Sequence, residues 1–129
     1  MSRQARRQVT DLVTPRLEDG EEILGAASPW AARLGRTPLL LTGRHLHRLA
    51  LTDRRLIVFE RRHRRHRDAG PVVDEPIDRL ELSAARSRLT LYQVIVVVGD
   101  GPRYVFEFRR RDHGTGRALV RMLHATRQP

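Results

Sequence analysis

Cysteine and lysine are both absent from this chain of 129 residues, and only six residues are aromatic. The lack of cysteine excludes a disulfide framework and thiol catalysis, and it is compatible with a reducing compartment. Long apolar runs are missing too, because the longest aliphatic stretch, Val94 to Val98, is far shorter than the roughly 20 residues of a membrane-spanning helix. We therefore expect one soluble domain in the cytoplasm, with no targeting or membrane-spanning segment.

Every basic residue of the chain is arginine: 25 arginines stand against 15 acidic residues, for a formal net charge of +10. Such a complete bias is typical of a GC-rich genome, so the number of arginines alone is not evidence of function. Their distribution is uneven, since residues 1–70 hold 15 arginines and 8 acidic residues, whereas residues 71–129 hold 10 and 7. Arginine stays charged and presents a planar fork to phosphate or carboxylate, so a cluster of arginines favours polyanions.

Two apolar runs around a polar tetrad, from Leu49 to Phe59, predict the central β-hairpin. Apolar residues recur at every second position of each arm, as in strands with a buried face. Asp53 lies at the reversal, where we expect its carboxylate to accept hydrogen bonds from backbone N–H groups two residues further on.

The sequence of this hairpin at residues 51–56, Leu-Thr-Asp-Arg-Arg-Leu, resembles the LT-(D/N)-(R/K)-R-L hairpin of bacterial pleckstrin-homology-like (PH-like) domains, which include the YokE-like and related small families. Residues 76–80, Pro-Ile-Asp-Arg-Leu, are similar to the (I/L)-P-L-x-x-I segment that enters a middle strand of these domains. The resemblance implies a mainly β fold: a barrel of two orthogonal antiparallel sheets, about seven strands in all, capped by a C-terminal α-helix. The PH-like domain is expected at residues 18–127, after a basic extension or short helix at residues 1–17.

The spacing of apolar residues predicts the other elements. Val9, Leu12, Val13 and Leu17 predict a short amphipathic helix that ends near Pro15, and that packs on the domain, lies on an anionic surface or stays frayed in solvent. A longer helix is predicted from Asp112 to Arg127, with Asp112 or Thr115 as its cap. Strands are predicted at residues 23–27, 45–51, 56–59, 72–73, 77–82, 89–92, 94–98 and 104–108, with reversals at 84–88 and 99–102.

Residues 30–45 are predicted to form a connection, because they are rich in Gly, Pro and Arg. Its apolar Leu39, Leu40 and Leu41 either enter a membrane interface beside flanking arginines or pack against the barrel. His45 and His47 share one face of the following strand. No third ligand is nearby in the sequence, so we expect an exposed polar face there and no metal site.

The segment from Arg61 to Arg67 is the densest basic stretch, and it carries half of the net charge. Like charges resist burial, so we expect a solvated loop, which is either a tether or a site for an anion. In PH domains that bind phosphoinositides, the first, third and sixth inter-strand loops carry basic residues at the open end of the barrel. The resemblance thus gives nine candidates for binding an anion or lipid: Arg33, Arg36 and Arg44 in the first loop, Arg61, Arg62, Arg64, Arg65 and Arg67 in the third, and Arg103 in the sixth.

Catalytic motifs are missing from the sequence. None of the four serines lies in a Gly-x-Ser-x-Gly frame. The Gly-Asp-Gly at 99–101 leads into another strand, whereas a nucleotide-binding glycine loop leads into a helix. Asp74, Glu75 and Asp78 are expected to pair with arginine. We therefore expect no enzyme, no cofactor and no bound metal.

These observations predict a non-catalytic adaptor that binds an anionic membrane, at its inner face, or an acidic protein partner through basic loops. One alternative is protein interaction or self-assembly through sheet edges, which would give a homo-oligomer. Another is nucleic-acid binding by the Arg-rich loop. Nucleic-acid binding would lack aromatic residues for base stacking, because Tyr104, Phe106 and Phe108 alternate along a strand, where we expect them to pack in the core.

Overall fold

The computed structural model describes residues 1–34, 44–61 and 70–127. Within this part the mainly β fold class is confirmed, because eight antiparallel strands form an open sheet, with a short helix before them and a longer one after them. The short 3₁₀ turns are η1 (Thr14–Arg16), η2 (Ile77–Arg79) and η3 (Arg110–Asp112). The helices and strands are α1 (Arg3–Val13), β1 (Ile23–Ala27), β2 (Trp30–Leu34), β3 (His45–Thr52), β4 (Arg55–Glu60), β5 (Val73–Pro76), β6 (Leu80–Arg88), β7 (Leu91–Val98), β8 (Arg103–Phe108) and α2 (His113–Arg127).

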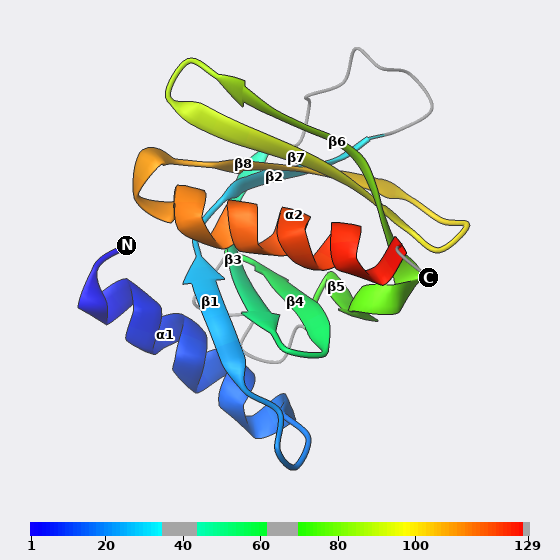
Figure 1. Cartoon of the computed structure of the whole chain (residues 1–129). Helices are drawn as coiled ribbons and strands as arrows, with labels where there is room; N and C mark the ends of the chain where they lie inside the picture. The colour runs from blue at the N-terminus through cyan, green and yellow to red at the C-terminus, as the bar shows by residue number, and fades with distance from the viewer. Residues whose placement is uncertain (35–43, 62–69, 128–129) are drawn as a thin grey trace.

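The sheet follows the order β5-β4-β3-β2-β8-β7-β6, and β1 pairs with β3 beside this path. Its two halves meet at β2, which pairs with β8 over its whole length but with β3 only through Trp30 and Ala31. Figure 1 shows β3, β4 and β5 on one side of α2 and β2, β8, β7 and β6 on the other. The helix therefore covers the space between the two halves.

The prediction of a connection at residues 30–45 is wrong at its start, because Trp30–Leu34 forms β2. Ser28 and Pro29 separate this strand from β1. Proline has no N–H group to donate to a ladder, so one strand cannot pair continuously through it. The chain instead bends there, and the N–H of His47 donates to the carbonyl of Pro29 at 2.8 Å. The strand predicted at residues 23–27 is therefore present as β1, and β2 is an additional strand within the predicted connection.

The prediction for residues 77–92 is also wrong in part. Ile77–Arg79 is a 3₁₀ turn, and the residues predicted to reverse the chain, 84–88, instead continue β6 in a ladder with β7. The reversal is displaced to Leu89 and Thr90, where Leu89 has a positive φ of 55°. The reversal at 99–102 is confirmed, and Gly99 has the positive φ, 56°, that glycine accepts without strain.

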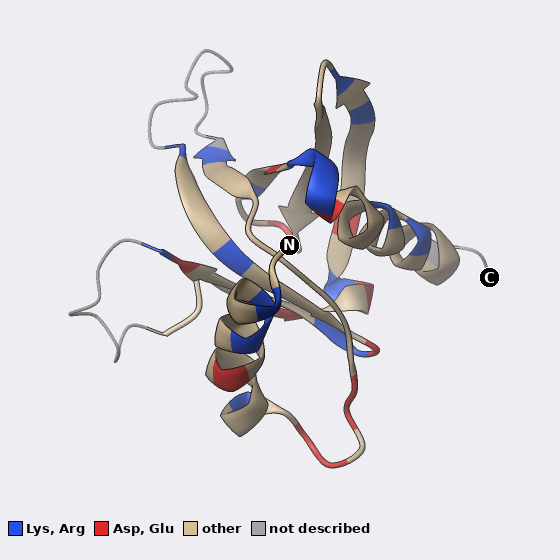
Figure 2. Ribbon diagram, turned by 90° about the vertical axis from the view of Figure 1, so that its left-hand side faces the viewer, with Lys and Arg blue, Asp and Glu red and all other residues tan. Residues whose placement is uncertain are grey.

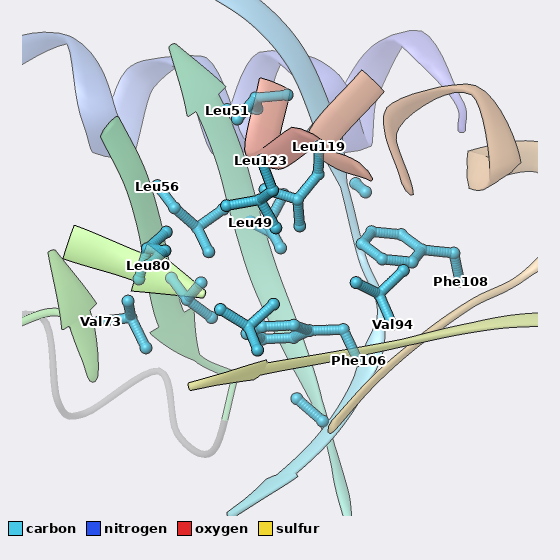
Figure 3. Close-up of a cluster of buried hydrophobic side chains, with 14 of the residues drawn as sticks. Leu49, Leu51, Leu56, Val73, Leu80, Val94, Phe106, Phe108, Leu119 and Leu123 are labelled. Atoms are coloured by element: carbon cyan, nitrogen blue, oxygen red, sulfur yellow. The ribbon is translucent and has the colours of Figure 1, made fainter. Parts of the chain in front are cut away.

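The main core lies between the two halves of the sheet and α2. The β3–β4 hairpin and α2, both confirmed, supply most of it together with the aromatic strand β8. Figure 3 shows these side chains converging from the strands and the helix. The labelled members are Leu49, Leu51, Leu56, Val73, Leu80, Val94, Phe106, Phe108, Leu119 and Leu123, each less than a tenth exposed.

The N-terminal helix packs on the opposite face of the hairpin. Val9 and Val13 of α1 are buried against a second cluster that includes Ile57 and Phe59. The Ser2 side chain accepts a hydrogen bond from the Ala5 N–H at 3.1 Å and so caps the helix. The predicted helix is therefore present and folds back on the domain. Neither described helix is long and apolar enough to cross a bilayer.

Candidate functional site

Four of the nine predicted arginines lie in the described part of the chain: Arg33, Arg44, Arg61 and Arg103, called here the strand-end arginines. All four side chains are exposed. Arg33 lies near the end of β2, Arg103 begins β8, and Arg44 and Arg61 flank β3 and β4. The other five predicted residues, Arg36, Arg62, Arg64, Arg65 and Arg67, lie outside the described residues, as do Leu39, Leu40 and Leu41.

The strand pairing arranges these four arginines around β2. Arg103 is the register partner of Leu34 and Arg33 is that of Tyr104, so both arginines lie at one end of the β2–β8 ladder, on opposite faces of the sheet. At the other end, the Arg61 N–H donates to the Leu46 carbonyl at 3.1 Å, two residues from Arg44. Leu46 is itself the register partner of Trp30. The strand-end arginines therefore border the place where β2 and β3 separate, and Figure 2 shows basic positions at these strand ends.

Arg44 differs from the other three because it already has partners. Its Nε lies 2.7 Å from Oε1 of Glu107, and its guanidinium carbon lies 4.9 Å from the centre of the Trp30 ring. Both contacts hold it against the sheet. Within the described residues, Arg33, Arg61 and Arg103 have no carboxylate at ion-pair distance. No carboxylate in the described part of the chain therefore competes with an external anion for these three arginines.

A fifth basic residue, Arg48 in the middle of β3, was missed by sequence reasoning. Partial burial lowers the pKa of the Arg48 guanidinium, and the positive charge of Arg61 lowers it further. Its Nη2 donates to Oε1 of Gln8 at 3.3 Å, a neutral partner that leaves its charge uncompensated. The sequence did not single out Arg48, because a polar residue is expected at its position in a strand of alternating apolar and polar residues. An anion bound near Arg48 and Arg61 would relieve the repulsion between their two positive charges.

The connection between β8 and α2 forms a second basic surface. Arg109, Arg110 and Arg111, called here the corner arginines, are all exposed. They line an open pocket of about 460 Å³ together with Thr90, Leu91 and the first turn of α1. The run of three arginines is visible in the sequence. It lies outside the three loops that the PH-like resemblance singles out, so the prediction omitted it.

The two residues predicted to cap α2 make other contacts. Asp112 is 4% exposed, its Oδ2 accepts a hydrogen bond from the Ser28 N–H at 3.0 Å, and its Oδ1 lies 3.7 Å from the amino nitrogen of Met1. The Thr115 hydroxyl donates to the Ala26 carbonyl at 3.1 Å. Both residues therefore join the start of α2 to the bend between β1 and β2, and neither acts as the predicted cap.

Arginine has a structural role at the opposite end of the molecule. Arg55 and Glu21 form a bidentate pair, with Nε to Oε2 and Nη2 to Oε1 both at 2.9 Å. The Glu21 side chain is fully buried, and the hydrogen bonds from Arg55 lower its pKa from the ordinary 4.5 to about 2, although burial opposes the shift. Arg55 also binds Asp74 at 2.9 Å and the carbonyl of Arg16, and its own pKa is raised chiefly by Glu21. All these contacts fix the N-terminal turn to the hairpin.

The hairpin turn is held by Thr52, where Asp53 was predicted. The Thr52 hydroxyl oxygen accepts from the N–H groups of Arg54 at 3.1 Å and Arg55 at 2.9 Å, and it donates to Glu21 Oε2 at 2.6 Å. Asp53 instead accepts from the Glu22 N–H at 3.0 Å through Oδ1. The prediction for Asp53 is therefore wrong. The Thr-Asp pair of the motif connects the hairpin to the acidic turn before β1.

The expectation of an exposed polar face at the two histidines of β3 is not met at His47. His47 is 7% exposed, and its Nδ1 lies 2.8 Å from the carbonyl oxygen of His45, so the expected exposed face is wrong for this residue. The described ranges hold no group of three or more His, Asp or Glu side chains placed to bind a metal ion.

Two of the surface carboxylates pair with arginine, as predicted. Asp74 pairs with Arg55, and Glu75 pairs with Arg79.

No protein-family model and no curated protein matches the chain. The PH-like assignment therefore stays a prediction that depends on the hairpin sequence and the order of the elements. Any function has to be argued from the surfaces of this molecule alone.

Proposed function

We propose that the chain is a non-catalytic binding module of PH-like type that docks on an anionic membrane through its strand-end arginines. One observation carries the proposal: Arg33, Arg61 and Arg103 are exposed and have no carboxylate partner among the described residues, although 15 acidic residues are available to the chain. The five remaining candidates, Arg36, Arg62, Arg64, Arg65 and Arg67, lie outside the described residues and join the proposal from the sequence alone.

Electrostatic attraction supplies the binding energy in this proposal. An arginine near an anionic bilayer contributes about 1 kcal/mol, which is about fivefold in affinity. The repulsion between Arg48 and Arg61 adds to this gain, since a lipid phosphate between them compensates both charges. Attraction of this kind weakens as salt is raised, because exposed charges are screened over about 8 Å at physiological ionic strength.

The test is co-sedimentation with vesicles of phosphatidylcholine alone and of phosphatidylcholine with phosphatidylglycerol, at low and physiological salt. The strand-end variant is Arg33→Gln, Arg61→Gln and Arg103→Gln. The control variant removes the same charge elsewhere, through Arg54→Gln, Arg79→Gln and Arg121→Gln. We expect the strand-end variant to bind anionic vesicles on the order of a hundredfold more weakly than the wild type, and the control to lose far less.

Three results would contradict the proposal. One is equal loss in both variants, which would mean that only net charge matters. Another is the absence of wild-type binding to anionic vesicles at physiological salt. The third is retention of an acidic peptide or an oligonucleotide in place of vesicles, which would assign the surface to an acidic protein or to nucleic acid.

Self-assembly through a sheet edge stays the second candidate, because β6 ends the sheet order and has nine residues. Its exposed residues include the small Ser83, Ala85 and Ser87, which permit close approach of another strand. The other end strand, β5, has four residues and ends in Pro76, so it is a poorer edge. Sizing at several protein concentrations tests this candidate. A proline at Ala85 should abolish any concentration-dependent dimer.

A further inference from the structure

The corner arginines lie next to the tip of the β6–β7 hairpin. Thr90 of the tip and Leu91, the first residue of β7, line the same pocket as Arg109, Arg110 and Arg111. A hydrogen-bonding contact of 3.0 Å between His113 Nε2 and the Thr90 carbonyl oxygen ties the hairpin to the start of α2. Figures 1 and 2 show the hairpin tip, the β8–α2 corner and the N-terminus on one side of the molecule. This surface is separate from the strand-end arginines.

The charge of this surface is strongly positive. The three corner arginines and Arg86 and Arg88 of the hairpin are all exposed. Asp112 is the carboxylate among the described lining residues; its Oδ2 accepts from the Ser28 N–H, and its Oδ1 lies 3.7 Å from the Met1 amino nitrogen. Among the hairpin arginines, Arg86 donates from Nε to Oε1 of Gln93 at 2.9 Å, a neutral acceptor. A ligand with several anionic groups therefore fits this surface.

Leu89 at the hairpin tip breaks two rules of local structure. It has a φ of 55°, in the left-handed region where Gly and Asn are the favoured residues. Its side chain is also fully exposed, so no packing within the described fold compensates for the backbone strain. Gly99 occupies the corresponding strained position of the next hairpin, so the chain uses the favoured residue there. A strained residue without structural benefit indicates a function at that position.

A fully exposed apolar side chain near several exposed arginines has the chemistry of a membrane anchor. The side chain gains free energy by entering the interfacial layer, while the arginines bind lipid phosphates and keep their charges at the surface. A soluble acidic peptide or a nucleic acid would engage the arginines but would offer Leu89 no apolar environment. The presence of Leu89 therefore favours a lipid surface over either.

We propose that this corner is a second membrane-contact site, at which Leu89 inserts into a bilayer and Arg88 and the corner arginines bind the phosphates of anionic phospholipids. The inference goes beyond the proposed function, because it assigns a different surface and adds an apolar contribution that the strand-end arginines lack.

Leu89→Asn separates function from folding, because Asn is well tolerated at positive φ. The variant should unfold at the same or a higher temperature than the wild type, yet bind phosphatidylglycerol-containing vesicles several-fold more weakly. Arg110→Gln with Arg111→Gln should lower the same affinity about fivefold per arginine, and leaves the Arg109 contact with the Ser28 carbonyl intact. Arg54→Gln with Arg121→Gln is the control of equal charge.

Insertion itself is measured with Leu89→Trp and brominated lipids, against the background of Trp30 in the wild type. Quenching well above that background is the expected result. The inference is overturned if Leu89→Asn binds as tightly as the wild type, if the added tryptophan is not quenched, or if poly-glutamate competes fully with vesicles. Loss of binding only in the strand-end variant would overturn this inference and leave the proposed function standing, whereas loss only in the corner variants would do the reverse.

Discussion

Some arginines of this molecule are paired with carboxylates of the fold, and others are exposed without such a partner among the described residues. Comparing the two groups distinguishes arginines that stabilise the fold from those that can bind a ligand. Arg55 meets two carboxylates, Glu21 and Asp74, and a backbone carbonyl, so its hydrogen-bonding capacity is used within the fold. Arg33, Arg61 and Arg103 meet no carboxylate among the described residues, although they carry the same charge. A buried arginine needs partners to compensate for lost hydration, whereas an exposed one does not. The arginines without partners are therefore the ones available to a ligand.

The largest expected effect on stability comes from Glu21→Gln, which breaks the ion pair between Glu21 and Arg55. Removing one member of a buried, hydrogen-bonded ion pair leaves the other uncompensated, so we expect a loss of about 3 kcal/mol in the free energy of unfolding. Urea denaturation followed by circular dichroism measures it. Glu18→Gln is the matched control, because the Glu18–Arg54 pair at 3.2 Å is exposed and should contribute less than about 0.5 kcal/mol. Equal losses in the two variants would contradict the assigned role of the buried pair.

The same pair should make stability fall in acid. The pKa of Glu21 is depressed in the folded state to about 2 from the ordinary 4.5. Its stabilisation is therefore complete above pH 4.5 and is lost as the pH falls toward 2, up to about 3 kcal/mol. Urea midpoints at a series of pH values for the wild type and Glu21→Gln test this. The two curves should converge as the pH approaches 2, and curves that stay parallel would exclude Glu21 as the cause.

A smaller loss is expected for Thr52→Val. The substitution removes the hydroxyl that accepts from the Arg54 and Arg55 N–H groups and donates to Glu21. Losing these hydrogen bonds should cost about 2 kcal/mol in the free energy of unfolding. Asp53→Asn keeps an oxygen that can accept from the Glu22 N–H, so it should change stability by less than about 0.5 kcal/mol. A larger loss of stability for Asp53→Asn than for Thr52→Val would mean that Asp53, and not Thr52, stabilises the turn.

The smallest effect is expected where the arginines have no partners. Replacing Arg33, Arg61 and Arg103 by Gln should leave the free energy of unfolding within about 0.5 kcal/mol of the wild type, because exposed side chains without contacts contribute little. Removing Arg61 also relieves its repulsion with Arg48. A loss of 2 kcal/mol or more in the same urea experiment would mean that these arginines serve the fold after all.

The sequence predicted what depends on local pattern. Alternation between Leu49 and Phe59 was sufficient for the hairpin, and the apolar spacing of Leu119 and Leu123 was sufficient for α2. The prediction was wrong where local signals conflicted with pairing. Trp30–Leu34 became a strand because β8 pairs with it, and Ala84–Arg88 extended because β7 does. Leu89 gave no turn signal, because leucine is a poor choice for the left-handed conformation it adopts.

The candidate site was only partly predictable. The resemblance named loops, and its candidates Arg33 and Arg103 lie at the same end of the β2–β8 ladder. It could not show that Arg44 is held by Glu107 and Trp30, since these contacts join residues distant in sequence. The corner arginines gather with Thr90 and Leu91 through the β7–β8 pairing, and a motif search does not contain that information.

The most direct test of the comparison is a nitrogen-15 spectrum of the arginine Nε–Hε groups, recorded before and after adding bicelles that contain phosphatidylglycerol. The account predicts that the Arg33, Arg61 and Arg103 signals shift or broaden, while the Arg55 signal, held by Glu21, stays in place. Unchanged strand-end signals, or a shift of Arg55 as large as theirs, would contradict it.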